Sequence, residues 1–578
     1  MRSGAAERTD AADGTGGSPA GDGVPRPAGP APDGASRTAG AVSGRFLARA
    51  TLLSAALSMA AAVLGLGRDQ TLAHLFGAGA ETDAFLVAWT VPEMASTLLI
   101  EDGMAFVLVP AFSLALARRG RGPLGPDPVR ALVAASLPRL CLALAGAAAL
   151  LVLGAPLLVA VLAPGLSDAS LAVACTRLTG TCVLSFGLAG YCSAALRAHR
   201  SYLAPGAIYI AYNAVIIATM FVLAAHWGVR AAALGVALGG CAMALALAPS
   251  LWRRLARRPG EADEADEADE AGVPEAPDGD RDGVRAFAPA LVCAVLLFAV
   301  GRQSQVLIER YFASGLPAGA ISHLNYAQKV AQLPMSLAMM VCVVTFPVVA
   351  RAVADGDIRR ARDRVERDLV LMACLVLFGT SVVVACAPAI VQLLFQRGAF
   401  TAGDTAATAA VMRVYALGLL GHTLVGALVR SYFSTGRTSW YPPAAMAIGV
   451  VATVGLSAWA VEPWGARGIA AANAAGITLT ALLLLLGLGP QSVPVRVPRV
   501  AGALARPVGA AVGATPAGLF GAGLADAPAV SAAAGFACAG AVFVALAWLL
   551  DAAGARSLLL PVPQSVRSPL TRKLRHGR

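Results

Sequence analysis

Charged residues are scarce in this chain of 578 residues, because Asp, Glu, Lys and Arg together make up only 14% of it. Lysine is almost missing and occurs only at Lys329 and Lys573. A soluble protein carries about 25% charged residues, whereas here hydrophobic residues make up 57% of the sequence. A water-soluble fold could not hide so large an apolar excess. The composition therefore excludes an ordinary soluble protein and indicates a polytopic membrane protein.

Sequence patterns of enzymatic chemistry are missing as well. No H-E-x-x-H, P-loop or G-x-S-x-G segment occurs, and the six His residues are scattered. The ten Cys residues form no C-x-x-C pair and lie almost all in apolar runs, which is typical of small buried side chains and not of a disulfide or metal framework. We therefore expect a protein that is not an enzyme, without metal site or cofactor.

Apolar runs long enough to cross a bilayer, which takes about 20 residues, are abundant. Their connections alternate between Arg-rich and base-poor segments, and the basic ones stay in the cytosol. This alternation predicts an even number of spans with both termini in the cytoplasm. The fourteen candidate spans are 46–75, 83–117, 131–163, 169–196, 204–226, 229–252, 285–312, 319–350, 366–395, 404–432, 440–461, 466–488, 498–524 and 527–551.

Short motifs recur in the two halves of the chain at nearly equal distances. Arg68 and Arg302 each follow a glycine and are 234 positions apart, and Pro110 and Pro347 are 237 apart. Such offsets predict a duplicated six-helix unit, and parallel repeats of this kind bind substrate between them. The predicted organisation is a disordered cytoplasmic tail, an N-lobe, an acidic cytoplasmic linker, a C-lobe, two C-terminal helices and a basic cytoplasmic tail, over 1–44, 45–252, 253–284, 285–488, 489–552 and 553–578.

The few charges inside the apolar runs fall in spans one, two, seven and eight, which are corresponding members of the two repeats. Charge within the hydrocarbon is costly and normally faces a cavity or a partner. These side chains are therefore predicted to line a central cleft. The candidate cavity residues are Arg68, Asp83, Glu101, Asp102, Arg302 and Lys329.

Other interpretations stay open for several charges. Arg68 could instead extend to the outer membrane interface. Asp83 begins span two, so it either caps a helix N-terminus or pairs with Arg68. Glu309 and Arg310 stand near a helix end and are expected at the interface.

Prolines interrupt spans two and eight. Each removes a backbone hydrogen bond and bends its helix. Broken helices at matching places in two repeats point to the binding site and to moving gates, although simple packing kinks would give the same pattern. The candidate gating residues are Pro92, Pro110, Pro334 and Pro347.

Several motifs of the chain follow one family pattern. They are Gly67-Arg68-Asp69, Leu75-Phe76-Gly77-Ala78-Gly79, Thr82-Asp83-Ala84-Phe85, Val109-Pro110, Ala163-Pro164-Gly165, Leu324-Asn325-Tyr326-Ala327, Gln332-Leu333-Pro334 and Leu394-Phe395-Gln396-Arg397-Gly398-Ala399-Phe400. Over about 47–488 the chain thus resembles the MurJ/MviN lipid II flippases of the multidrug/oligosaccharidyl-lipid/polysaccharide exporter superfamily. The resemblance implies two six-helix lobes in a V, with two C-terminal helices that shape a groove for a polyprenyl tail.

The resemblance also implies the activity. A flippase of this family moves an undecaprenyl-diphosphate-linked peptidoglycan precursor from the inner to the outer leaflet of the bacterial plasma membrane, and cavity cations hold the diphosphate. Arg68, Asp83 and Glu101 match functional positions of the family. The expected partners are this lipid-linked glycan and the bilayer, with no nucleic acid. A monomer is expected, and coupling to an ion or to the membrane potential stays open.

The chain departs from the family pattern at three places. Ala61-Ala62 replaces a Ser-Arg pair, Glu93-Met94-Ala95 stands where an arginine-containing segment is usual, and Gln328-Lys329 replaces Asp-Arg. Lysine keeps the charge but not the bidentate fork of arginine. A flippase for another polyprenyl-linked glycan is therefore one alternative. A cation-coupled exporter of drugs or metabolites that uses its acidic residues is another.

Overall fold

The computed structural model describes residues 56–57, 59–101, 103–119, 127–199, 201, 203–256, 289–339, 358–433, 439–491 and 496–552. Within these ranges every regular element is helical and no strand occurs. The prediction of an all-α polytopic membrane protein is confirmed. The predicted tails at 1–44 and 553–578, and most of the predicted linker, lie outside the described residues.

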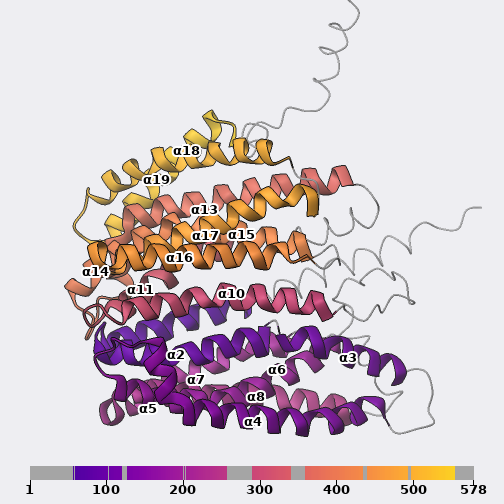
Figure 1. Cartoon of the computed structure of the whole chain (residues 1–578). Helices are drawn as coiled ribbons and strands as arrows, with labels where there is room; N and C mark the ends of the chain where they lie inside the picture. The colour runs from indigo at the N-terminus through magenta and orange to yellow at the C-terminus, as the bar shows by residue number, and fades with distance from the viewer. Residues whose placement is uncertain are drawn as a thin grey trace, which may run out of the picture.

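The first half of the chain forms a group of helices that we call the N-terminal bundle, drawn at the bottom of Figure 1. It opens with a helix over 59–76. Helix α7 runs along α8, α6 packs on α3 and α8, and α5 packs on both α2 and α4. The bounds are α2 (Ala80–Ala95), the π-helix η1 (Ser96–Glu101), α3 (Gly103–Arg119), α4 (Pro128–Leu162), α5 (Ala169–Gly180), α6 (Cys182–Ala198), α7 (Leu203–Trp227) and α8 (Arg230–Ala256).

The second half forms the C-terminal bundle, above the first in Figure 1. Helix α10 lies on α16, α16 pairs with α17, and α13 packs on α14. The last two helices pack on each other and on α13, at the top of the figure. The bounds are α10 (Pro289–Ala313), α11 (Ala320–Ala331), α13 (Ile358–Phe395), α14 (Ala402–Leu417), α15 (Leu419–Phe433), α16 (Tyr441–Trp464), α17 (Ala466–Gln491), α18 (Val497–Ala522) and α19 (Pro528–Leu549).

Nine of the described helices are long and apolar enough to cross a membrane, or ten if α14 and α15, bent by 45°, form one span. These coincide with ten of the predicted spans. Predicted spans seven and thirteen, which are α10 and α18, do not meet the same test. Predicted spans one and eight lie partly outside the described residues. The total of fourteen therefore stays a prediction.

Predicted span two is a helix that changes its winding in the middle. Pro92 lies inside α2 and the six-residue π-helix η1 follows directly. The hydroxyls of Ser96 and Thr97 donate back to the carbonyl of Glu93, at 3.1 and 3.2 Å. π-helical turns inside α-helices are frequent at functional sites. The π-helix begins three residues after Glu93, which belongs to the site described below.

The other predicted gating prolines occupy different surroundings. Pro110 lies inside α3, and Pro334 follows the break at Gln332 that ends α11. Gly379 of α13 lies so close to Pro334 that an added Cβ would overlap the proline ring. Pro347 lies outside the described residues. Gating by these residues stays a prediction.

The two bundles meet at one end of the molecule, on the left in Figure 1, through the turns around 77–79, 163–168, 314–319 and 396–401; we call this the closed end. The amide of Ala399 donates to the carbonyl of His74 at 2.9 Å. Gly77 has φ +66° and faces the same turn, where an added Cβ would lie 2.6 Å from the carbonyl oxygen of Ala399. The closed end thus depends on a close contact between the backbones of Gly77 and Ala399, which a side chain at Gly77 would prevent.

Replacing Gly77 by Ala is expected to loosen the closed end. The left-handed conformation alone costs an L-residue about 1–2 kcal/mol, and the new Cβ adds a clash with Ala399. Electron spin–spin distances between labels at Glu81 and Ala402, in a chain freed of native cysteines, should shift to longer values.

The matched control is Gly79→Ala. Gly79 has an extended backbone with φ −160° and no neighbour within 4 Å of an added Cβ, so the distance distribution should stay as in the parent chain. An unchanged distribution for Gly77→Ala as well would contradict a closed end that depends on this contact.

Candidate functional site

A cluster of three charged side chains joins the two bundles in the interior. The carboxylate of Glu93 on α2 accepts hydrogen bonds from Nη2 of Arg310 on α10 and from Nζ of Lys329 on α11, both at 3.1 Å. The guanidinium of Arg310 also donates to the hydroxyl of Thr90. The Glu93 and Arg310 side chains are only 20% and 5% exposed, and charges so buried require partners. We call this the Glu93 bridge.

Arg68 lies beside the bridge, on the helix over 59–76. Its guanidinium contacts Asp69 at 2.7 Å, donates to the side-chain oxygen of Asn213 on α7 at 3.3 Å, and stacks on Trp89 with 4.4 Å to the ring centroid. Such cation–π contacts strengthen when they are shielded from water. At 14% exposure, Arg68 lies inside the protein, which favours a cavity position over a position at the membrane interface.

A narrow pocket lies between Arg68 and Lys329, with walls from both bundles. Two of the six predicted cavity residues thus come together, across two helices that are far apart in the sequence. One side of the pocket is apolar. It is lined by Arg68, Asp69, Leu72, Phe85, Leu86, Trp89, Ile216, Met220, Asn325 and Lys329.

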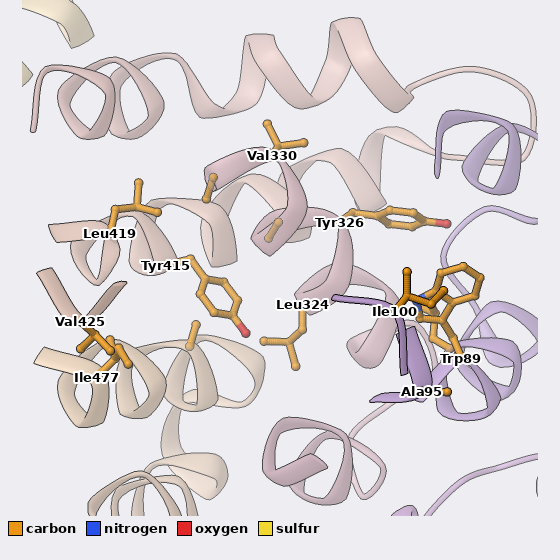
Figure 2. Packing of buried hydrophobic residues seen from close by; sticks show 14 of the residues in the cluster. Trp89, Ala95, Ile100, Leu324, Tyr326, Val330, Tyr415, Leu419, Val425 and Ile477 are labelled. Carbon is orange, nitrogen blue, oxygen red and sulfur yellow. The ribbon is translucent and has the colours of Figure 1, made fainter. Parts of the chain in front are cut away.

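Apolar packing holds these polar groups in place. Trp89 and Ile100 from the N-terminal bundle, Leu324 from α11, and Tyr415 and Leu419 from the C-terminal bundle belong to one buried cluster (Figure 2). Close-packed side chains of this kind leave little freedom to their neighbours. The cluster therefore fixes the positions of α2 and α11, from which Glu93 and Lys329 extend.

Asp83 caps a helix of the opposite bundle. Its carboxylate accepts hydrogen bonds from the backbone amides of Gly319 and Ser322, at 2.7 and 2.8 Å, and from the Ser322 hydroxyl at 2.5 Å. These donors form the N-terminus of α11, whose own N-cap residue, Gly319, has no side chain to use. Asp83 is 3% exposed and is not paired with Arg68. The structure thus places this predicted residue in the contact between bundles.

Among the remaining predicted cavity residues, only Arg302 has a described side chain, and it does not contact this cluster. Arg302 is exposed on α10 and makes no hydrogen bond or ion pair within the part of the chain that the structure describes. Its neighbour Gln303 donates to the Thr97 hydroxyl at 3.0 Å. The side chain of Glu101 and the whole of Asp102 lie outside the described residues. Their cavity roles stay predictions.

The expectation that Glu309 and Arg310 lie at the membrane interface is wrong, because they are only 5% and 4% exposed. Arg310 belongs to the Glu93 bridge, and Glu309 accepts a hydrogen bond from Asn473 of α17 at 2.6 Å. One signal was available in the sequence. Arg302, Gln305 and Glu309 recur at three- and four-residue spacing, which places them on one face of an otherwise apolar helix.

The chemistry available to this site is the exchange of anions. Each cation of the pocket is already paired with a carboxylate, Arg68 with Asp69 and Lys329 with Glu93. An incoming anionic group must displace these carboxylates or share their donors. Within the described residues no group of three or more His, Cys, Asp or Glu side chains has metal-binding geometry.

Comparison with known proteins supports the resemblance seen in the sequence. A family model described as lipid II flippase MurJ matches residues 72–521. The lipid II flippase MurJ of Burkholderia cenocepacia is 27% identical over 455 residues, which cover 77% of this chain and 84% of that protein. The probable lipid II flippase MurJ of a Synechocystis species is 25% identical over 401 residues, covering 68% of this chain and 72% of that protein.

Solved structures show the same fold. A lipid II flippase MurJ in an inward closed conformation has a TM-score of 0.70 at 18% identity, over 88% of this chain and 100% of that one. An inward-facing multidrug resistance transporter of the MATE family, in the MOP superfamily, has a TM-score of 0.56 at 14% identity, over 78% and 98% of the two chains. Since the family model covers most of its length, this chain belongs to the lipid II flippase MurJ family.

Proposed function

We propose that this chain flips lipid II, an undecaprenyl-diphosphate-linked peptidoglycan precursor, from the inner to the outer leaflet of the bacterial plasma membrane. The observation that carries the proposal is the pocket of Arg68 and Lys329 between the two bundles. The family model that matches this chain is described as lipid II flippase MurJ. Guanidinium and ammonium groups are the usual protein partners of phosphate oxygens. We also propose that the chain acts as a monomer.

The orientation in the membrane is part of the proposal. Arginines gather at the ends of helices opposite the closed end, such as Arg118 of α3, Arg253 of α8 and Arg359 of α13; we call this the arginine end. Basic connections remain in the cytoplasm. The arginine end then faces the cytoplasm with both termini, and the closed end faces outward.

Substrate binding would act on the Glu93 bridge. A diphosphate that enters between the bundles offers Lys329 and Arg310 phosphate oxygens in place of the Glu93 carboxylate. Since Glu93 lies on α2 and its two partners on α10 and α11, this exchange removes an ionic contact between the bundles. The bundles, acting as two lobes, are then freer to move, as alternating access requires.

Growth rescue tests the proposed substrate. The chain is expected to restore growth of a bacterium depleted of its own lipid II flippase, and Arg68→Ala should abolish the rescue because a pocket cation is lost. The control is Arg177→Ala on the exposed face of α5, which should rescue as well as the parent chain. A correctly inserted parent chain that fails to rescue would contradict lipid II as the substrate.

A double-mutant cycle tests the bridge itself. Glu93→Gln leaves two cations without an anion, and breaking a buried pair in this way costs about 3–5 kcal/mol. The thermal unfolding midpoint in detergent should therefore fall clearly for Glu93→Gln and for Lys329→Gln. The double variant should lose less than the sum of the two, with a coupling of about 0.5–3 kcal/mol. Additive losses would show that the two side chains do not interact.

A flippase for another polyprenyl-linked glycan is a second candidate. It is favoured by Glu93, which stands where the family has an arginine-containing segment and which neutralises Arg310 and the pocket residue Lys329. Deletion in the native bacterium separates the candidates. Loss of a surface or secreted polysaccharide with normal peptidoglycan would favour this second substrate over lipid II.

A further inference from the structure

A large cleft lies away from the pocket, at the arginine end, between the first turns of α13 and of α18. Its volume is about 1090 Å³. Six arginines line it against three acidic residues. The lining residues are Arg359, Arg362, Asp363, Glu366, Arg367, Val370, Leu371, Arg496, Pro498, Arg499, Val500, Gly502, Ala503, Arg506 and Asp551. We call this the α13–α18 cleft.

Two of its acidic side chains are engaged by a single arginine. Nη2 of Arg496, at the start of α18, lies 2.9 Å from Asp363 and 3.1 Å from Glu366, both on α13. The backbone amide of Arg496 donates to Glu366 as well, at 3.0 Å. This arrangement ties the N-terminus of α18 to α13 and uses much of the negative charge of Asp363 and Glu366.

Three other arginines of the cleft lack an acceptor. Arg359, Arg367 and Arg499 are exposed and make no hydrogen bond or ion pair within the described ranges of the chain. The Nε atom of Arg362 is buried without a hydrogen-bond partner, and the carboxylate oxygen of Asp363 lies 3.8 Å away. The cleft therefore has a surplus of guanidinium donors, which favours an anion that can accept several hydrogen bonds at once.

The inner part of the cleft is apolar. Val370 and Leu371 follow the arginines on α13, and Val500 and Ala503 follow on α18. The cleft thus offers apolar side chains of both helices next to its arginines. A soluble anion would use only the arginine rim, whereas a lipid would use the rim and the apolar part together.

We propose that the α13–α18 cleft binds the headgroup phosphate of an anionic glycerophospholipid, such as phosphatidylglycerol, with its acyl chains against α13 and α18. Basic pockets between transmembrane helices on the cytoplasmic side are suited to such headgroups. The site is separate from the substrate pocket, since α13 and α18 lie at the top of Figure 1 and α2 in the lower bundle. The bound lipid would reinforce the contact that Arg496 makes between α18 and α13.

Lipid titration of the purified full chain in detergent, followed by native mass spectrometry, tests the site. The test variant is Arg367→Gln with Arg499→Gln. Its affinity for phosphatidylglycerol should fall about tenfold or more, the loss expected when charge-assisted hydrogen bonds are removed. The matched control is Arg118→Gln with Arg253→Gln, which removes two exposed charges at the same end but outside the cleft. It should bind as the parent chain does.

Two further variants keep the test decisive. Arg359→Gln changes a single exposed residue and should weaken binding less than the double variant. Arg367→Lys with Arg499→Lys keeps the charge but not the fork, so it should give an intermediate affinity. If the glutamine double variant unfolds, these two variants decide, and parent-like affinity in both would contradict the proposal.

Competition identifies the ligand. Phosphatidylcholine should bind clearly more weakly than phosphatidylglycerol, because its headgroup carries no net charge. Inorganic phosphate at the same concentration should not displace the lipid. Displacement by phosphate would assign the cleft to a soluble anion, and displacement by undecaprenyl diphosphate would assign it to the transported substrate class; either result would overturn the proposal, as would equal loss in the control.

Discussion

A charge buried between membrane helices must have a partner, and this constraint sets how the two bundles face each other. Glu93 supplies one carboxylate for two cations, Arg310 and Lys329, which come from two other helices. Removing a single member of a buried pair leaves an uncompensated charge. One glutamate on α2 therefore helps to set the positions of α10 and α11 relative to α2.

Helix α2 carries a second carboxylate with the same dependence on the opposite bundle. Asp83 is bound by the N-terminus of α11, and Glu93 stands ten residues later, about 15 Å along an α-helix. Both side chains are satisfied by donors that the N-terminal bundle does not contain. Any separation of the bundles at the closed end therefore changes the surroundings of Glu93 as well. Helix α2 thus connects the closed end to the Glu93 bridge.

The features of this protein that depend on local composition could be predicted from the sequence. Apolar runs predicted the helical class, and a lone lysine within such a run marked Lys329, because a charge in hydrocarbon requires an unusual environment. The depth of Arg310 was not predictable in this way, since it stands near a helix end and only the packing of α10 and α11 buries it. Nor was the partner of Asp83, because backbone amides of a distant turn carry no sequence signature.

Arg68 and Arg302 each follow a glycine, but they lie in different surroundings. Arg68 is followed by Asp69, which neutralises it and fixes it beside Trp89. Arg302, in the second Gly-Arg pair, is followed by Gln303, whose amide carries no charge and binds Thr97. An arginine paired with a carboxylate must lose that partner before it binds an anion, whereas an arginine without one does not. Of the two, Arg302 is the cation without a carboxylate partner among the described residues, whereas Arg68 would have to exchange Asp69 for any other anion.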